Sequence, residues 1–136
     1  AVAVAAEACK QAGAKRVVVL PVSAPFHCSL MAPAAERLQE ALNCIEFAVP
    51  QIPVIQNVSA RVCADPADIK QNLVKQMYAA VRWTECVQEM IALGVASMIE
   101  CGPGKVLTGL GRRISRDLKT HNLASEADIL TLQEGL

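Results

Sequence analysis

The feature that most constrains this chain is an apolar run that ends at a proline and leads into a loop carrying a histidine. The run covers residues 17–20, and the following loop, residues 21–31, contains Pro21, Pro25 and His27. Such an apolar run is typical of a buried β-strand, and a proline ends a strand because it lacks a backbone N–H. We therefore expect His27 to lie on a stiff loop at the end of a buried strand.

The rest of the sequence alternates between helical and strand-like patterns. Apolar residues recur every three or four positions in the helical segments, and short apolar runs bounded by Gly or Pro indicate strands. Asp65 is the expected N-cap of one helix, with Pro66 in its first turn. Strands that alternate with helices predict an α/β fold. The expected helices are 1–12, 32–44, one from residue 65, one capped by Thr84 and ending at Gly94, one after the turn 101–104, and 127–133. The expected strands or extended segments are 16–22, 50–58, 96–100 and 119–123.

Composition argues against several classes of protein. The chain has 136 residues, 53% of them hydrophobic, which suits one domain with a sizeable core. Basic and acidic residues number 13 each, and a net charge of zero argues against nucleic acid as the main partner. No apolar run approaches the roughly 20 residues that span a bilayer. We therefore expect neither nucleic acid nor a membrane as a partner.

The cysteines predict neither a metal site nor a disulfide framework. There are six, widely spaced and with no C-x-x-C pair: Cys9, Cys28, Cys44, Cys63, Cys86 and Cys101. Zinc sites require closely spaced pairs, so no metal is expected, and reduced thiols are typical of the cytoplasm. The chain starts at Ala1 inside a helical pattern, so we expect a fragment or a processed chain.

His27 is the first candidate for chemistry. A histidine in a fixed direction is suited to general acid–base catalysis, provided that a partner fixes its tautomer. The alternative is a loop histidine that only caps a backbone group. Cys28 is a nucleophile in principle, but neighbouring residues in an extended segment point in different directions, which argues against a Cys28–His27 pair.

Two further features have a structural and a functional interpretation. The segment 102–105, Gly-Pro-Gly-Lys, lacks the pattern of a phosphate loop because Val106 follows the lysine, which favours a tight strand-to-helix turn. The segment 105–119 is locally basic, and Lys15 and Arg16 form a second basic pair. Cations late in a helix offset its dipole; the alternative is a landing site for phosphate or for an acidic protein.

Several motifs together resemble those of bacterial malonyl-CoA:acyl-carrier-protein transacylases. P-V-S-x-P-F-H followed by L-M-x-P-A-A, residues 21–35, resembles the histidine loop of that family. Other segments match in the same order: Gln56-Asn57-Val58, then Lys75-Gln76-Met77-Tyr78 leading into Trp83-Thr84, then Glu100-Cys101-Gly102-Pro103-Gly104-Lys105-Val106-Leu107. The resemblance extends from Ala8 to about Ile114.

The resemblance implies a fold and a mechanism. The family has a large α/β-hydrolase-like domain with a small ferredoxin-like domain inserted in it, so residues 1–22 are expected to end the small domain and residues 23–136 to be the C-terminal part of the large one. A serine takes malonyl from coenzyme A and passes it to the phosphopantetheine thiol of acyl carrier protein. His27 takes the role of the histidine that activates the serine, and the main-chain carbonyl of Gln76 that of its orienting partner. The side chain of residue 76 is therefore expected to matter little, and no cofactor is implied.

The sequence departs from the family pattern in one respect that matters. It contains no G-x-S-x-G, the elbow that carries the family's serine, so the chain alone is expected to be inactive and to need the missing N-terminal half. Arg16 and Arg113 are the candidates for contacting coenzyme A or carrier protein, because the planar fork of arginine suits phosphate. Two alternatives stay open: a non-catalytic module that binds carrier protein or coenzyme A through Arg16 and Arg112 or Arg113, and a transacylase for another acyl group in polyketide synthesis.

Overall fold

A two-stranded parallel sheet and the helices around it form the centre of the computed structural model, which describes residues 1–135. Strand β3 (Ser97–Cys101) pairs with β4 (Lys119–Leu123), Ser97 opposite Lys119 and Cys101 opposite Leu123. Helix α5 (Val106–Ile114) connects the two strands. This β-α-β unit confirms the mixed α/β class, and both strands lie where the sequence predicts them.

The sheet packs on α4 (Trp83–Ala92) and α5 through a small apolar core. Its buried residues are Val87, Met98 and Leu118, with Trp83, Met90 and Ile114 against them. Helix α5 comes close to the sheet at Gly111, where an added Cβ would lie 2.7 Å from the Met98 Cε and 3.2 Å from the Thr120 Cγ2. A larger residue at 111 would require the end of the Met98 side chain and the Thr120 methyl to shift.

A second core joins α2 (Ala32–Asn43) to α3 (Pro66–Lys75). Its buried residues are Ala35, Leu42 and Val74. The predicted cap of α3 is confirmed, because the Asp65 carboxylate accepts hydrogen bonds from the amides of Ala67 and Asp68 at 2.8 and 3.1 Å. The short helix η1 (Ser29–Met31) leads from the His27 loop into α2. The strands β1 (Ile55–Gln56) and β2 (Arg61–Val62) form an antiparallel hairpin before α3.

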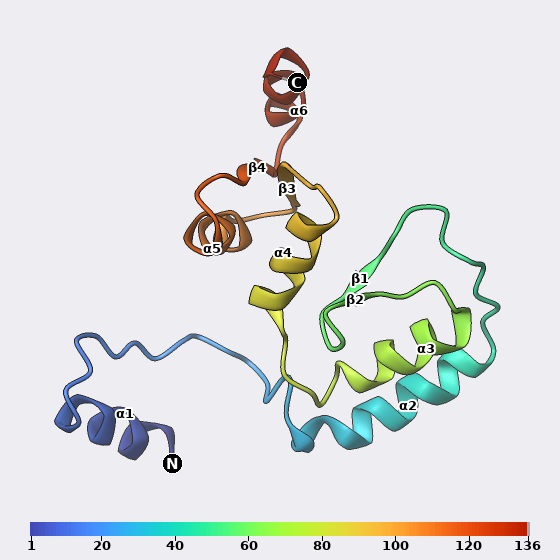
Figure 1. Cartoon of the computed structure of the whole chain (residues 1–136). Helices are drawn as coiled ribbons and strands as arrows, with labels where there is room; N and C mark the ends of the chain where they lie inside the picture. The colour runs from blue at the N-terminus through green and yellow to red at the C-terminus, as the bar shows by residue number, and fades with distance from the viewer. Residues whose placement is uncertain (136) are drawn as a thin grey trace.

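The strand predicted over residues 16–22 is wrong. This segment is extended but pairs with no strand of the described chain, and Val19 and Leu20 are each 68% exposed. A β-strand requires a partner to satisfy its backbone groups, and this part of the chain offers none. Figure 1 shows α1 (Val2–Gln11) and the extended segment after it set apart from the other helices, and no residue of α1 is buried.

Three smaller predictions also differ from the structure. The extended segment 50–58 is reduced to the two residues of β1, since the chain turns back at once into β2. Thr84 does not cap α4, which begins at Trp83 with Arg82 at the N-cap. Helix α6 (Glu126–Gly135) begins one residue before the predicted helix. Within residues 1–135, no helix is both long and apolar enough to cross a membrane.

Candidate active site

The backbone and the ring of His27 are both held by the end of α3. The His27 amide donates to the carbonyl of Met77 at 3.1 Å, and the ring Nδ1 lies 2.9 Å from the carbonyl oxygen of Gln76. A carbonyl oxygen only accepts, so Nδ1 carries the hydrogen in this contact. In the neutral ring, the second nitrogen, Nε2, then has a free lone pair. The arrangement therefore leaves Nε2 able to accept a proton.

The end of a helix supplies these carbonyls because its last C=O groups have no partner within the helix. Gln76 is the C-cap of α3, and its amide still donates to Asn72 at 2.9 Å. The His27 loop leads through η1 into α2, which packs on α3. Both sides of the His27–Gln76 contact are thus anchored to the same pair of helices.

The backbone of His27 is in the left-handed region, with φ of 59°. This conformation is uncommon for residues other than glycine, although histidine is among those that tolerate it better. It turns the chain sharply after Pro25, so that the amide and the ring of His27 reach neighbouring carbonyls. The side chain is exposed in this chain.

Cys28 does not pair with His27. Its thiol donates to the carbonyl of Pro25 at 3.1 Å. Among the described residues, no hydrogen bond joins the Nε2 of His27 to a serine or a cysteine. Within residues 1–135, the Nε2 of His27 is therefore not paired with a serine or cysteine side chain.

Sequence reasoning missed Asn57, which follows β1. Its Nδ2 donates to the side-chain Oε1 of Gln76 at 2.9 Å. The motif around Asn57 contributes to the family resemblance, but no spacing rule links it to a residue 19 positions away. The side chain of Gln76 is therefore engaged in a contact separate from that of its carbonyl.

The turn after β3 is closed by the protein's own carboxylate. Glu100 accepts hydrogen bonds from the amides of Leu107 and Thr108 at 3.1 and 2.8 Å and from the Thr108 hydroxyl at 2.7 Å. The bonds from the Thr108 amide and hydroxyl hold the pKa of Glu100 below its usual value. Gly102 and Gly104 have φ of 124° and 97°, which glycine adopts readily. The amides that a phosphate loop would offer an anion are occupied, so this is a strand-to-helix turn.

The candidate arginines differ in whether they form hydrogen bonds within the fold. Arg112 is used within the fold, because its guanidinium donates to the hydroxyl of Thr120 at 2.8 Å and to its carbonyl at 3.3 Å. Arg16 and Arg113 are exposed. No hydrogen bond or ion pair between described residues links either of them to His27. The structure thus brings His27 and Gln76 together and leaves the two arginines as free surface cations within residues 1–135.

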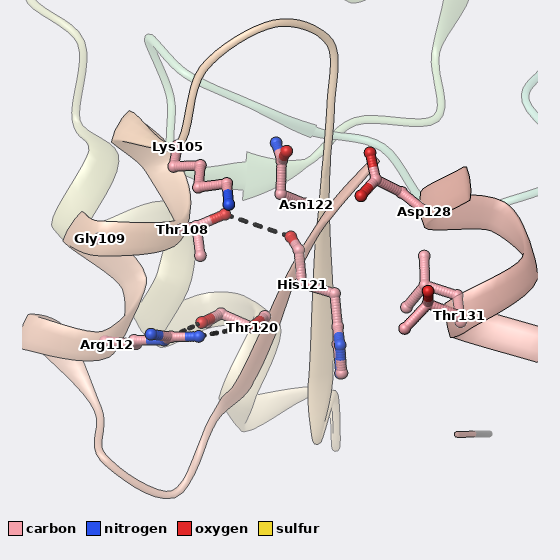
Figure 2. A pocket seen from close by; sticks show the side chains of 10 residues that line it. Lys105, Thr108, Gly109, Arg112, Thr120, His121, Asn122, Asp128 and Thr131 are labelled. Carbon is pink, nitrogen blue, oxygen red and sulfur yellow. Dashed lines mark hydrogen bonds between the residues drawn. The ribbon is translucent and has the colours of Figure 1, made fainter. Parts of the chain in front are cut away.

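A polar pocket of about 530 Å³ lies between α5, β4 and α6. Lys105, Arg112, His121, Asn122 and Asp128 are among its lining residues, and Figure 2 shows Lys105, Asn122 and Asp128 gathered at one end. The hydroxyl of Ser125 and the amides of Ala124 and Ser125 lower the pKa of Asp128. Within residues 1–135, no group of His, Cys, Asp and Glu side chains is arranged to hold a metal ion.

A second cavity, of about 520 Å³, is mainly apolar and is lined by residues of β1, α4 and β3 and of the segments beside them. Asn57, Trp83 and Met98 are among its lining residues. The indole N–H of Trp83 and the Oε1 of Gln56 are buried there or nearby without a hydrogen-bond partner in the described chain. Buried polar groups are normally satisfied, so these two atoms are exceptions among the described residues.

Solved structures show which class of protein has this fold. The chain superposes with a TM-score of 0.87 on an acyl carrier protein S-malonyltransferase from Vibrio cholerae, at 50% identity over 96% of this chain and 43% of that one. It superposes with a TM-score of 0.90 on a malonyl-CoA:acyl carrier protein transacylase from Xanthomonas oryzae, at 44% identity over 96% and 42%. The class is that of acyltransferases acting with acyl carrier protein. No family model matches the chain.

Curated sequences identify the relatives more closely. The malonyl CoA-acyl carrier protein transacylase of Bacillus subtilis is 47% identical over 98% of this chain and 43% of its own length. That of Escherichia coli K12 is 50% identical over 81% and 36%. The resemblance seen in the motifs is confirmed: the chain is homologous, over nearly its whole length, to the C-terminal part of malonyl-CoA:acyl-carrier-protein transacylases. It spans less than half the length of these relatives.

Proposed function

We propose that this chain is the histidine-bearing part of an enzyme that moves malonyl from coenzyme A to acyl carrier protein in fatty acid synthesis. The observation that carries the proposal is the 2.9 Å contact between the Nδ1 of His27 and the Gln76 carbonyl. It directs the free lone pair of Nε2 outward from a rigid loop, as a general base requires. The homology to transacylases supplies the reaction in which such a base is needed.

In the proposed reaction His27 moves one proton in each half. Nε2 takes the proton of the serine hydroxyl as its oxygen attacks the malonyl thioester, and the imidazolium returns this proton to the departing thiolate of coenzyme A. In the second half Nε2 takes the proton of the phosphopantetheine thiol as its sulfur attacks the seryl ester, and returns it to the serine oxygen. The Gln76 carbonyl keeps the ring oriented and stabilises the imidazolium in both halves. No cofactor takes part.

The serine comes from the missing N-terminal half in this proposal. Three features support such a partner: the unpaired segment 16–22, the single neighbour of β3 in the described sheet, and the apolar cavity beside Trp83. Residues 1–22 then belong to the small ferredoxin-like domain, and residues 23–136 to the large α/β-hydrolase-like domain. We place the complete enzyme in the cytoplasm, where coenzyme A thioesters are made and reduced cysteines persist.

A fusion tests the proposal. The serine-bearing portion of the Bacillus subtilis relative, joined ahead of this chain, is expected to transfer malonyl from malonyl-CoA to holo-acyl carrier protein. Transfer is measured by the mass of the carrier protein, and the B. subtilis portion alone serves as control. A folded fusion that binds carrier protein but transfers nothing contradicts catalysis and favours a non-catalytic binding module.

A second candidate is a transacylase that serves polyketide synthesis. The chain superposes with a TM-score of 0.90, at 45% identity, on a malonyl-transacylase solved in complex with a type II polyketide acyl carrier protein. The likeness is as strong as that to the fatty acid enzymes. Offering the fusion both kinds of carrier protein in competition decides between the two candidates.

The exposed arginines yield a prediction for substrate binding. Coenzyme A carries phosphates and carrier proteins are acidic, so Arg16 and Arg113 are proposed to form a cationic rim that attracts both. In the fusion, the double change of Arg16 and Arg113 to alanine is expected to raise KM for both substrates roughly twofold to tenfold, the range for exposed charge pairs. Added salt should raise KM of the unchanged fusion more than that of the double variant. Unchanged KM values at low salt contradict the cationic rim and leave Arg113 only the role of balancing the dipole of α5.

A further inference from the structure

We propose that Asn57 is a positioning residue for His27, acting through the side chain of Gln76 to fix which ring nitrogen carries the proton. The inference rests on the proposed role of His27 as general base. It deepens that role by extending the chain of contacts from the ring to the β1–β2 turn.

Asn57 is itself held firmly. It lies in the turn that joins β1 to β2, which is closed by the Ala60 amide donating to Gln56 at 2.8 Å. Its own carbonyl accepts from the amide of Arg82 at 2.8 Å, which ties the turn to the start of α4. The side chain is half-buried. Asn57 therefore presents its amide group from a fixed point between two parts of the fold.

Gln76 needs such a support because it ends α3. The carbonyl of Gln76 and the N–H of Met77 belong to one peptide unit. This N–H donates to the carbonyl of Val74 at 3.1 Å. This single bond leaves the peptide unit free to tilt at a helix end, where fraying is usual. The bond from Asn57 to the Oε1 of Gln76, at 2.9 Å, restrains the same residue from its other side. Together they aim the Gln76 carbonyl at the Nδ1 of His27.

The consequence for chemistry is the tautomer of His27. With the carbonyl in place, the ring hydrogen stays on Nδ1 and the lone pair on Nε2. If the carbonyl tilts away, the hydrogen is free to move to Nε2, and that ring form cannot accept the serine proton. Asn57 thus affects the reaction step without touching a substrate.

The test uses the fusion of this chain with the serine-bearing portion. Asn57→Ala is expected to lower kcat roughly three- to tenfold, which corresponds to the free energy of one hydrogen bond. KM for malonyl-CoA should stay unchanged. The fraction of the Nδ1–H tautomer of the neutral His27 ring, read by ¹⁵N NMR, is expected to fall in parallel. Combining Asn57→Ala with Gln76→Ala should cost no more than Asn57→Ala alone, because both remove the same contact. Asn72→Ala, an equivalent truncation one turn earlier on α3, is the control and should change neither kcat nor the tautomer.

A second pair of variants tests the contact from its other side if Asn57→Ala does not fold. Gln76→Met removes the acceptor at similar size and should lower the Nδ1–H fraction, whereas Gln76→Glu keeps an acceptor for Asn57 and should preserve it. An unchanged tautomer in folded Asn57→Ala or in Gln76→Met overturns the proposal. The NMR measurement needs no turnover. An inactive fusion whose tautomer still depends on Asn57 therefore contradicts the proposed function and leaves the positioning role intact.

Discussion

Replacing His27 with alanine in the fusion is expected to lower kcat by roughly 10²–10⁴-fold, the usual contribution of a positioned general base. The carbonyl of Gln76, at the end of α3, orients the His27 ring through Nδ1. Nε2 is then left to accept a proton. KM for malonyl-CoA should change far less, since the proposed role of the ring is to transfer a proton and not to bind the substrate. The transfer assay at saturating substrate measures the effect.

His121→Ala is the matched control for this prediction. His121 lies on β4 and lines the polar pocket beside α5, and its carbonyl oxygen is 3.2 Å from the Thr108 hydroxyl oxygen. Its ring takes no part in the proposed reaction, so activity close to that of the unchanged fusion is expected. Near-normal turnover of the His27 variant would instead remove His27 from the mechanism.

The isolated chain is expected to aggregate or to behave as a molten globule. Its cores are small, and large apolar side chains lie on the surface, with Leu30 at 73% and Ile52 at 77% exposure. Exposed apolar patches and unpaired strand edges promote association. We expect strong binding of a hydrophobic dye, weak near-ultraviolet circular dichroism from Trp83 and Tyr78, and no cooperative melting transition.

Supplying the serine-bearing portion as a separate chain is the control for this second prediction. It should cover the apolar cavity beside Trp83 and restore a cooperative transition in the mixture. A sharp, cooperative melt of the purified monomer alone contradicts the prediction.

Several local features follow correctly from short-range rules, although the Thr84 cap does not. The Asp65 cap needs only the amides that follow it, and β3, β4 and the turn between Gly102 and Gly104 are bounded by short-range signals. The apolar run at 17–20 fails for the opposite reason: its sequence is that of a strand, but a strand needs a pairing partner, and residues 1–135 pair none with it.

The site was predictable in part. The family resemblance pointed to His27 and to the Gln76 carbonyl, and the structure places them 2.9 Å apart. Asn57 could not be predicted, because its contact with Gln76 depends on how the β1–β2 turn sits against the end of α3. Tertiary contacts between side chains of this kind leave no periodic pattern in a sequence.

The left-handed backbone of His27 is a conformation that most residues with a side chain adopt at a cost in stability. With φ of 59°, a glycine would fit there without the steric cost that a side chain carries. A chain selected for stability alone would therefore favour glycine at residue 27. The bonds to the Met77 and Gln76 carbonyls offset part of that cost, and they are the same contacts that aim the ring. In the proposed mechanism, the cost in stability leaves the ring already oriented before it accepts a proton.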